Sequence, residues 1–165
     1  MSAVIFMVNH YKTEAEIEAV VRGFESCSTA KSEFTHVSHL TVAVWYLRRS
    51  SVEPATEQMR ASLFRFIDHY GIEGKYHETL TVFWMRVVRR QLDDLDPKLT
   101  LLEAANAVVE TLSDSRLVFE YYSEALLWSD EARSVWVEPD LKPLDYPPTR
   151  TRASPTASAA CLVMS

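Results

Sequence analysis

Three histidines stand at spacings that would let them meet in one site. His36 and His39 are separated by two residues, and His77 follows further along the chain. A His-x-x-His pattern places two imidazoles on neighbouring turns of one helix face. Neutral imidazole is the commonest metal ligand in proteins, and three histidines with an open fourth position form a catalytic zinc site. The sequence therefore predicts a three-histidine site for a divalent transition metal, zinc or iron, whose bound water is the reactive species of a small metalloenzyme.

Polar residues close to these histidines are candidates for further roles. Glu78, directly after His77, is the first candidate for a general acid or base. Its expected direction on the helix counts against that role and suits a carboxylate at a helix N-terminus. Arg133, Thr81 and Asp140 are candidates for binding a substrate, with Arg133 holding an anionic group. Alternatively, Arg133 and Asp140 pair with each other and hold the C-terminal segment.

The helical period predicts which way the histidines face. In a helix expected over residues 32–49, His36 lies opposite the polar sector and His39 lies on the flank. In a helix expected over residues 77–92, His77 falls on the apolar face. We therefore expect His36 to be deeply buried with His39 beside it, and we expect His77 to face the interior.

Buried histidines also have a purely structural interpretation. An imidazole in the interior is commonly hydrogen-bonded to a hydroxyl or a carbonyl, and Thr79, Thr81, Tyr76 and Tyr46 offer hydroxyls here. The protein is then a non-catalytic helical module that binds a protein or a small-molecule partner. Whether the chain is an enzyme stays open at this point.

Two further enzyme hypotheses use the same residues. A metal-free enzyme would employ His36 or His77 as general base beside Glu78. The order Glu33-x-x-His36 also matches the unit of di-iron helical bundles. A di-iron site needs inward-facing carboxylates from other helices, and Glu120 and Glu124 are the candidates for these. It is the weaker metal hypothesis.

The composition excludes several functional classes. The chain has 165 residues, a net charge of −6 and only three glycines. The negative charge argues against nucleic-acid binding, and the scarcity of glycine argues against a phosphate-binding loop and a nucleotide cofactor. No stretch is long and apolar enough for a membrane span. The two cysteines, Cys27 and Cys161, are far apart, which favours a reducing, cytoplasmic location.

Apolar residues repeat with a helical period through most of the chain, so we predict an all-α fold. The expected architecture is a compact bundle of about five to six helices in a single domain over residues 1–146. Thr13 and Ser129 are expected N-caps, and Asp96 is the expected cap of a helix that ends near Leu112. Residues 135–148 contain several prolines and predict an extended strap over the bundle. The polar tail 147–165 is expected to be flexible. The remaining expected helices cover residues 13–25, 54–70, 117–125 and 130–134.

Three segments carry a resemblance: EFTHVSHLTVAVWYL (33–47), KYHETLTVFW (75–84) and YYSEALLWSDEARSVWVEPDLKPL (121–144). Together they resemble a group of small bacterial proteins with no established activity. The resemblance implies a bacterial, soluble, helical protein of one domain, and it transfers no function. Phe34 stands where the group more usually has tryptophan. The residues that the resemblance places in signature stretches are His36, His39, His77, Glu78, Thr79, Arg133 and Asp140.

Overall fold

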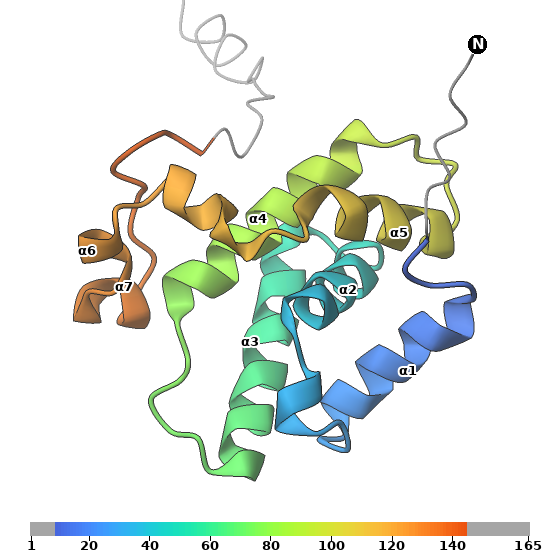
Figure 1. Ribbon diagram of the computed structural model, residues 1–165, viewed down its shortest axis with the longest axis horizontal. Helices are drawn as coiled ribbons and strands as arrows, with labels where there is room; N and C mark the ends of the chain where they lie inside the picture. The colour runs from blue at the N-terminus through green and yellow to red at the C-terminus, as the bar shows by residue number, and fades with distance from the viewer. Residues whose placement is uncertain (1–8, 145–165) are drawn as a thin grey trace, which may run out of the picture.

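The computed structural model describes residues 9–144, and within that range every regular element is a helix. The predicted all-α fold is therefore confirmed. Five longer helices form the body. The short turn η1 lies between the first two of them, and the other short helical turns follow the fifth (Figure 1). The expected tail 147–165 lies outside the described residues. The elements are α1 (Glu14–Glu25), η1 (Lys31–Glu33), α2 (His36–Leu47), α3 (Val52–Tyr70), α4 (Glu78–Asp94), α5 (Leu101–Leu112), η2 (Ser115–Glu120), α6 (Glu124–Leu127) and α7 (Asp130–Ser134), where η marks a 3₁₀ helix.

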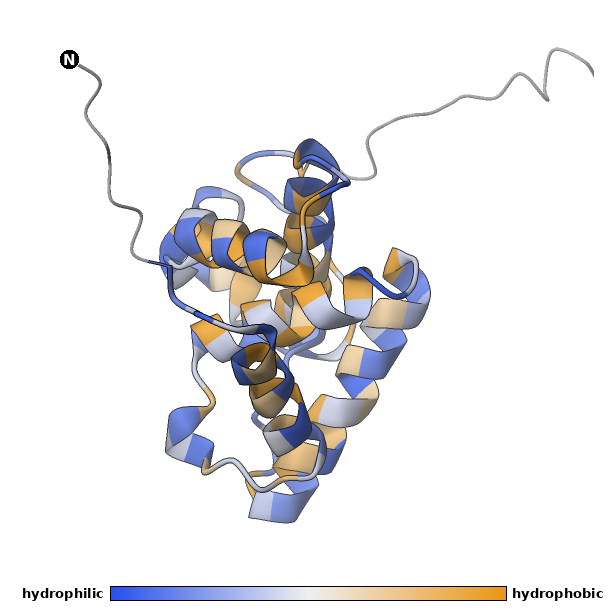
Figure 2. Ribbon diagram, turned by 90° about the vertical axis from the view of Figure 1, so that its right-hand side faces the viewer, coloured by the Kyte–Doolittle hydropathy of each residue, from blue (hydrophilic) through white to orange (hydrophobic). Residues whose placement is uncertain are grey.

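Helix α2 is the centre of the bundle. It contacts α1, α3, α4 and α5, and its residues 40–47 are all buried except Trp45. A helix that is apolar on nearly every side must be covered on every side. The surrounding helices alternate hydrophobic and hydrophilic bands in Figure 2, as helices with one buried face do. Even the polar Thr41 is fully buried there, with its hydroxyl 2.7 Å from that of Tyr11.

Side-chain caps set most helix starts. The expected caps Thr13 and Ser129 are confirmed. The expected second helix starts later than predicted, because Thr35 caps α2 in a reciprocal pair with Ser38. The expected start of the fifth helix at Asp96 is wrong. Thr100 forms the capping box there instead.

The predicted single helix over residues 117–125 is also wrong. The chain forms the 3₁₀ helix η2, turns, and then forms the short helix α6. Ser123 is the N-cap of α6 and donates two hydrogen bonds to the Asp140 carboxylate, from its backbone nitrogen at 2.8 Å and from its hydroxyl at 2.6 Å. Because this local cap competes with helix continuation, the apolar period alone misled the prediction.

The expected extended strap is confirmed as far as residue 144. It follows α7 and lies against the start of α4, where Thr79 bonds Val135 and Val137. The fully buried hydroxyl of Thr79 donates to the Val135 carbonyl at 2.8 Å and accepts the Val137 N–H at 3.2 Å. Tyr122 donates to the Val137 carbonyl at 2.6 Å. The strap is thus fixed to the start of α4 by side-chain hydrogen bonds.

Replacing Thr79 with valine should destabilise the fold. The Thr79→Val variant keeps the shape of the side chain but leaves the Val135 carbonyl and the Val137 N–H unpaired, which should cost about 2 kcal/mol of unfolding free energy. Urea denaturation measures it. Thr56→Val is the matched control, since the Thr56 hydroxyl only bonds a carbonyl of its own helix, and it should cost less than about 0.5 kcal/mol. Equal losses in the two variants would show that Thr79 does not anchor the strap.

Candidate functional site

The structure brings the three histidines to one pocket. The pocket has a volume of about 400 Å³ and lies among α2, α3 and α4, closed at its sides by the loop before α4, by η2 and by Trp128. His36, His39 and His77 all line it. They come from the start of α2 and from the start of α4, so two helix N-termini position the whole set.

His36 is half-buried, so the expected deep burial is wrong. It is the first residue of α2 and borders the open pocket. Its ring packs edge-on against Trp84 at 4.4 Å between centroids. Its Nε2 lies 2.9 Å from the carbonyl oxygen of Leu112, the last residue of α5. Because a carbonyl only accepts, Nε2 carries the proton, and the bond satisfies a carbonyl that the helix end leaves unpaired.

His39 uses the opposite nitrogen. Its Nδ1 donates to the Thr35 carbonyl at 3.0 Å, and its ring lies 4.4 Å from that of Phe34. Burial is the main cause that lowers the pKa of His39 from 6.5 to about 4. The hydrogen bond to the Thr35 carbonyl opposes this shift in part, and the nearby His36 adds a smaller lowering contribution to the pKa. The imidazole is therefore neutral at pH 7, with its proton on Nδ1.

His77 has both nitrogens engaged. It is the N-cap of α4, where its Nδ1 accepts the Leu80 N–H at 3.2 Å, a role that Ser, Thr, Asp or Asn usually fill. Its Nε2 donates to the Leu127 carbonyl at 2.7 Å. The predicted burial is confirmed, since the residue is 6% exposed. Burial lowers the pKa of His77, and the charge of Arg133 lowers it further.

These contacts bear on the metal hypotheses. Among residues 9–144 there is no group of three or more His, Cys, Asp or Glu side chains arranged to hold a metal ion. His77 does not fit a ligand role, because a metal bond through either nitrogen would replace a backbone hydrogen bond. The expected zinc or iron site at His36, His39 and His77 stays a prediction, with His36 and His39 as the ligands that keep a nitrogen without a described partner. The inward carboxylates expected for a di-iron site are wrong, since Glu120 and Glu124 are both exposed.

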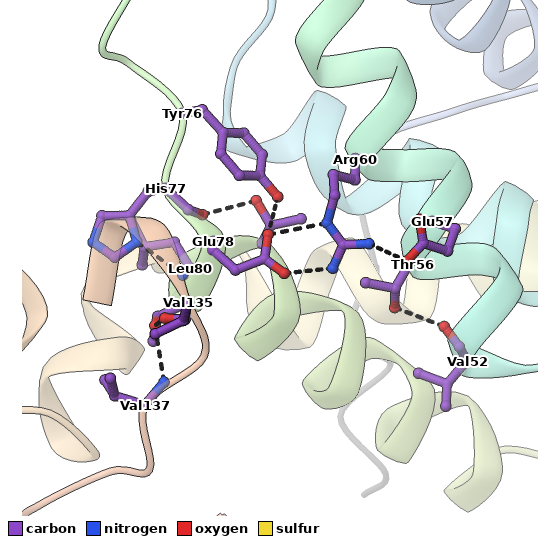
Figure 3. Close-up of polar contacts among 12 residues, drawn as sticks. Val52, Thr56, Glu57, Arg60, Tyr76, His77, Glu78, Leu80, Val135 and Val137 are labelled. Atoms are coloured by element: carbon purple, nitrogen blue, oxygen red, sulfur yellow. Dashed lines mark hydrogen bonds and ion pairs between the residues drawn. The ribbon is translucent and has the colours of Figure 1, made fainter. Parts of the chain in front are cut away.

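Glu78 is engaged in an ion pair away from the pocket. Its carboxylate accepts hydrogen bonds from the Arg60 guanidinium and the Tyr76 hydroxyl, and its side chain is 14% exposed. Figure 3 shows this carboxylate on the other side of the chain from the His77 ring. Burial raises the pKa of Glu78, but the hydrogen bonds from Arg60 and Tyr76 outweigh it and the pKa is lowered. A carboxylate held in this way is a weak base.

Of the three predicted substrate-binding residues, the structure places one at the pocket. Thr81 lines it, with its hydroxyl donating to the His77 carbonyl at 2.9 Å. The Arg133 guanidinium lies 5.6 Å from the ring centroid of Trp128. Asp140 caps α6 through Ser123, so the alternative pairing of Arg133 with Asp140 is wrong.

Sequence reasoning missed the pocket's aromatic wall. Trp84 and Phe119 are part of it, although their helical spacing predicts core positions. Trp128 also lines the pocket and is 46% exposed, which is unusual for so large an apolar side chain. Tyr76 completes the set. The one sequence feature that could have indicated an exposed tryptophan is the position of Trp128, which lies between two short capped helices and not on the apolar face of a longer helix.

Comparison of the chain with protein-family models, with curated proteins and with solved structures finds no match. The resemblance to a bacterial group therefore stays a prediction. None of the helices in the described part of the chain has the length and hydropathy needed to cross a bilayer.

The lowered pKa of His39 predicts a loss of stability in mild acid. The unfolded chain binds a proton at this ring near pH 6.5 and the folded chain only near pH 4. Between these values the unfolded state binds more protons, so the free energy of unfolding falls as the pH falls. The stability is complete above about pH 6.5, and on the order of 1 to 2 kcal/mol is lost by pH 5.

Urea denaturation at pH 7.5 and pH 5 measures this difference. The His39→Gln variant should lose less stability on acidification than the wild type. Some pH dependence should remain in the variant, because the pKa of His77 is lowered in the same direction. An unchanged pH dependence in His39→Gln would contradict the assignment.

Proposed function

We propose that this protein binds a small, mainly apolar molecule in the pocket among α2, α3 and α4, as a non-catalytic binding module. The observation that carries the proposal is an apolar pocket whose few polar groups are held in fixed orientations. Ligand sites are typically of this kind, with volumes of about 300 to 1,000 Å³. The apolar lining consists of Leu40, Ala43, Met59, Leu63, Ile67, Leu80, Trp84, Met85, Val118, Phe119 and Trp128.

The helix contacts favour a pocket that exists before the ligand arrives. The imidazoles of His36 and His77 bond carbonyls at the ends of α5 and α6, so they tie the elements on either side of the pocket together. The strap bonds of Thr79 hold the start of α4 from the opposite side. A preformed site needs little ordering when a ligand binds, which improves affinity.

The exposed Trp128 supports access from solvent. It lines the pocket and also reaches the surface, and the Arg133 guanidinium lies over its ring. An apolar side chain in this position offers a first contact to an apolar molecule. Lys75 and Ser115, which also line the pocket, are exposed as well.

Metal binding is the second candidate function. Its support is that His36 and His39 each keep one ring nitrogen without a hydrogen bond to any described residue. Titration of dialysed protein with zinc alone, followed by the amount of zinc bound per chain, tests metal binding separately from the binding of an apolar molecule. Stoichiometric zinc binding that is lost in a His36→Ala, His39→Ala double variant would favour the metal site.

Binding of the neutral fluorescent probe N-phenyl-1-naphthylamine tests the proposed function. At about −0.3 kcal/mol per non-hydrogen atom, the dissociation constant should be on the order of 100 µM. Ala43→Phe fills the pocket from α2 and should weaken binding at least about tenfold. The matched control is Ala61→Phe, which adds the same ring to the exposed face of α3 and should leave the affinity unchanged.

A melting curve for each variant separates lost binding from lost folding. If Ala43→Phe does not fold, Leu80→Trp fills the pocket from α4 and takes its place. Probe binding that is equal in the filled variant, the control and the wild type would show that the probe binds elsewhere, and would overturn the proposed function.

A further inference from the structure

The imidazole donors of the pocket are all engaged by the backbone. His36 donates to Leu112, His39 donates to Thr35, and His77 donates to Leu127. Each partner is a carbonyl oxygen, which cannot donate, so each bond fixes the position of the ring proton. A neutral imidazole has one donor and one acceptor, and here all three donors are occupied.

The hydroxyl donors of the pocket are engaged as well. Tyr76 donates to the Glu78 carboxylate, and Thr81 donates to the His77 carbonyl. The remaining polar lining residues, Lys75 and Ser115, are exposed. The imidazole and hydroxyl donors of the inner pocket are therefore all engaged, and the indole N–H groups of Trp84 and Trp128 are the side-chain donors there for which the described residues provide no hydrogen-bond partner.

Two acceptors remain. Nδ1 of His36 and Nε2 of His39 have no hydrogen-bond partner among residues 9–144. A half-buried nitrogen lone pair is stabilised when a donor reaches it. His39 is neutral at pH 7, so its free nitrogen is an acceptor and not a second donor.

The aromatic wall adds a preference for shape. Trp84 packs against His36, and Phe119, Trp128 and Tyr76 line the same space. Aromatic side chains pack well against flat rings in offset or edge-on arrangements. An aromatic ligand thus fits this wall better than a branched aliphatic one.

Building on the proposed function, we infer that the ligand is an uncharged aromatic molecule with a hydroxyl donor, that is, a phenol. The hydroxyl donates to the free nitrogen of His39 or His36, and the ring packs against the tryptophans. An aromatic carboxylate is disfavoured, because it would bring negative charge to nitrogen lone pairs in an apolar space. Lys75 lines the pocket, and its exposure leaves its charge largely screened by water, while the Arg133 guanidinium lies 5.6 Å from the ring centroid of Trp128.

Three matched probes test this inference at pH 7.5 by titration of ¹⁵N-labelled protein: 4-ethylphenol, 4-ethylanisole and 4-ethylbenzoate. They share a ring and an ethyl group, and only the phenol is a neutral donor. The phenol should bind about tenfold more tightly than the anisole, as expected for one hydrogen bond to a buried acceptor. The benzoate should bind most weakly.

Variants of His39 assign the preference to its nitrogen. His39→Leu should lower the ratio of phenol affinity to anisole affinity to about 1 if the hydroxyl donates to His39, and His36→Leu should do so if it donates to His36. His39→Gln offers an acceptor oxygen and should restore part of the preference. His69→Leu, on the exposed end of α3, is the control and should match the wild type.

The outcomes separate the two proposals. Equal affinities for phenol and anisole, or tighter binding of the benzoate, would overturn the inferred ligand class and leave the proposed function standing. If His39→Leu and His36→Leu both kept the wild-type preference, the assignment to these nitrogens would also be overturned. No binding of any of the three probes or of N-phenyl-1-naphthylamine would overturn both proposals.

Discussion

The arrangement of this protein depends on the need of each imidazole N–H in the pocket for an acceptor. The acceptors are carbonyls where the chain enters or leaves a helix, at Thr35, Leu112 and Leu127. The Leu112 and Leu127 carbonyls lie at helix C-termini and lack a partner within their own helix, whereas the Thr35 carbonyl also accepts the backbone N–H of His39. An unpaired buried N–H costs on the order of 1 to 3 kcal/mol. The bonds to Leu112 and Leu127 thus each satisfy two groups at once. Two of the three bonds also join elements far apart in the sequence and so define the walls of the pocket.

The same hydrogen bonds determine which donors and acceptors the histidines can still offer to a ligand. Because the ring N–H of each of the three pocket histidines is directed at a backbone carbonyl, these rings present acceptors to the pocket or nothing at all. His77 presents nothing, since its second nitrogen caps α4. Glu78, adjacent in sequence, is neutralised by Arg60 on the other side of the chain. A pocket whose imidazole N–H groups are all bonded to backbone carbonyls, and whose neighbouring carboxylate is held in an ion pair, is better suited to binding than to proton transfer.

The sequence predicts the parts of this structure that depend on local patterns. The all-α fold, the caps at Thr13 and Ser129 and the burial of His77 follow from helical period and capping chemistry. It cannot predict partners that come from distant chain segments. The Leu112 carbonyl that receives His36, and the Arg60 that pairs with Glu78, are set by tertiary packing. The metal site is predicted from the directions in which the histidine side chains point on their helices. Those directions carry no information on which backbone carbonyls the ring nitrogens will bond.

The most direct test of this account is the protonation pattern of the imidazoles, measured by long-range ¹H–¹⁵N correlation spectra at pH 7.5. The account predicts opposite neutral tautomers in one pocket, with the proton of His39 on Nδ1 and the proton of His77 on Nε2. A doubly protonated ring at either position, or the reverse tautomer at His39, would contradict it. In that case the pocket would offer a donor where the structure places an acceptor.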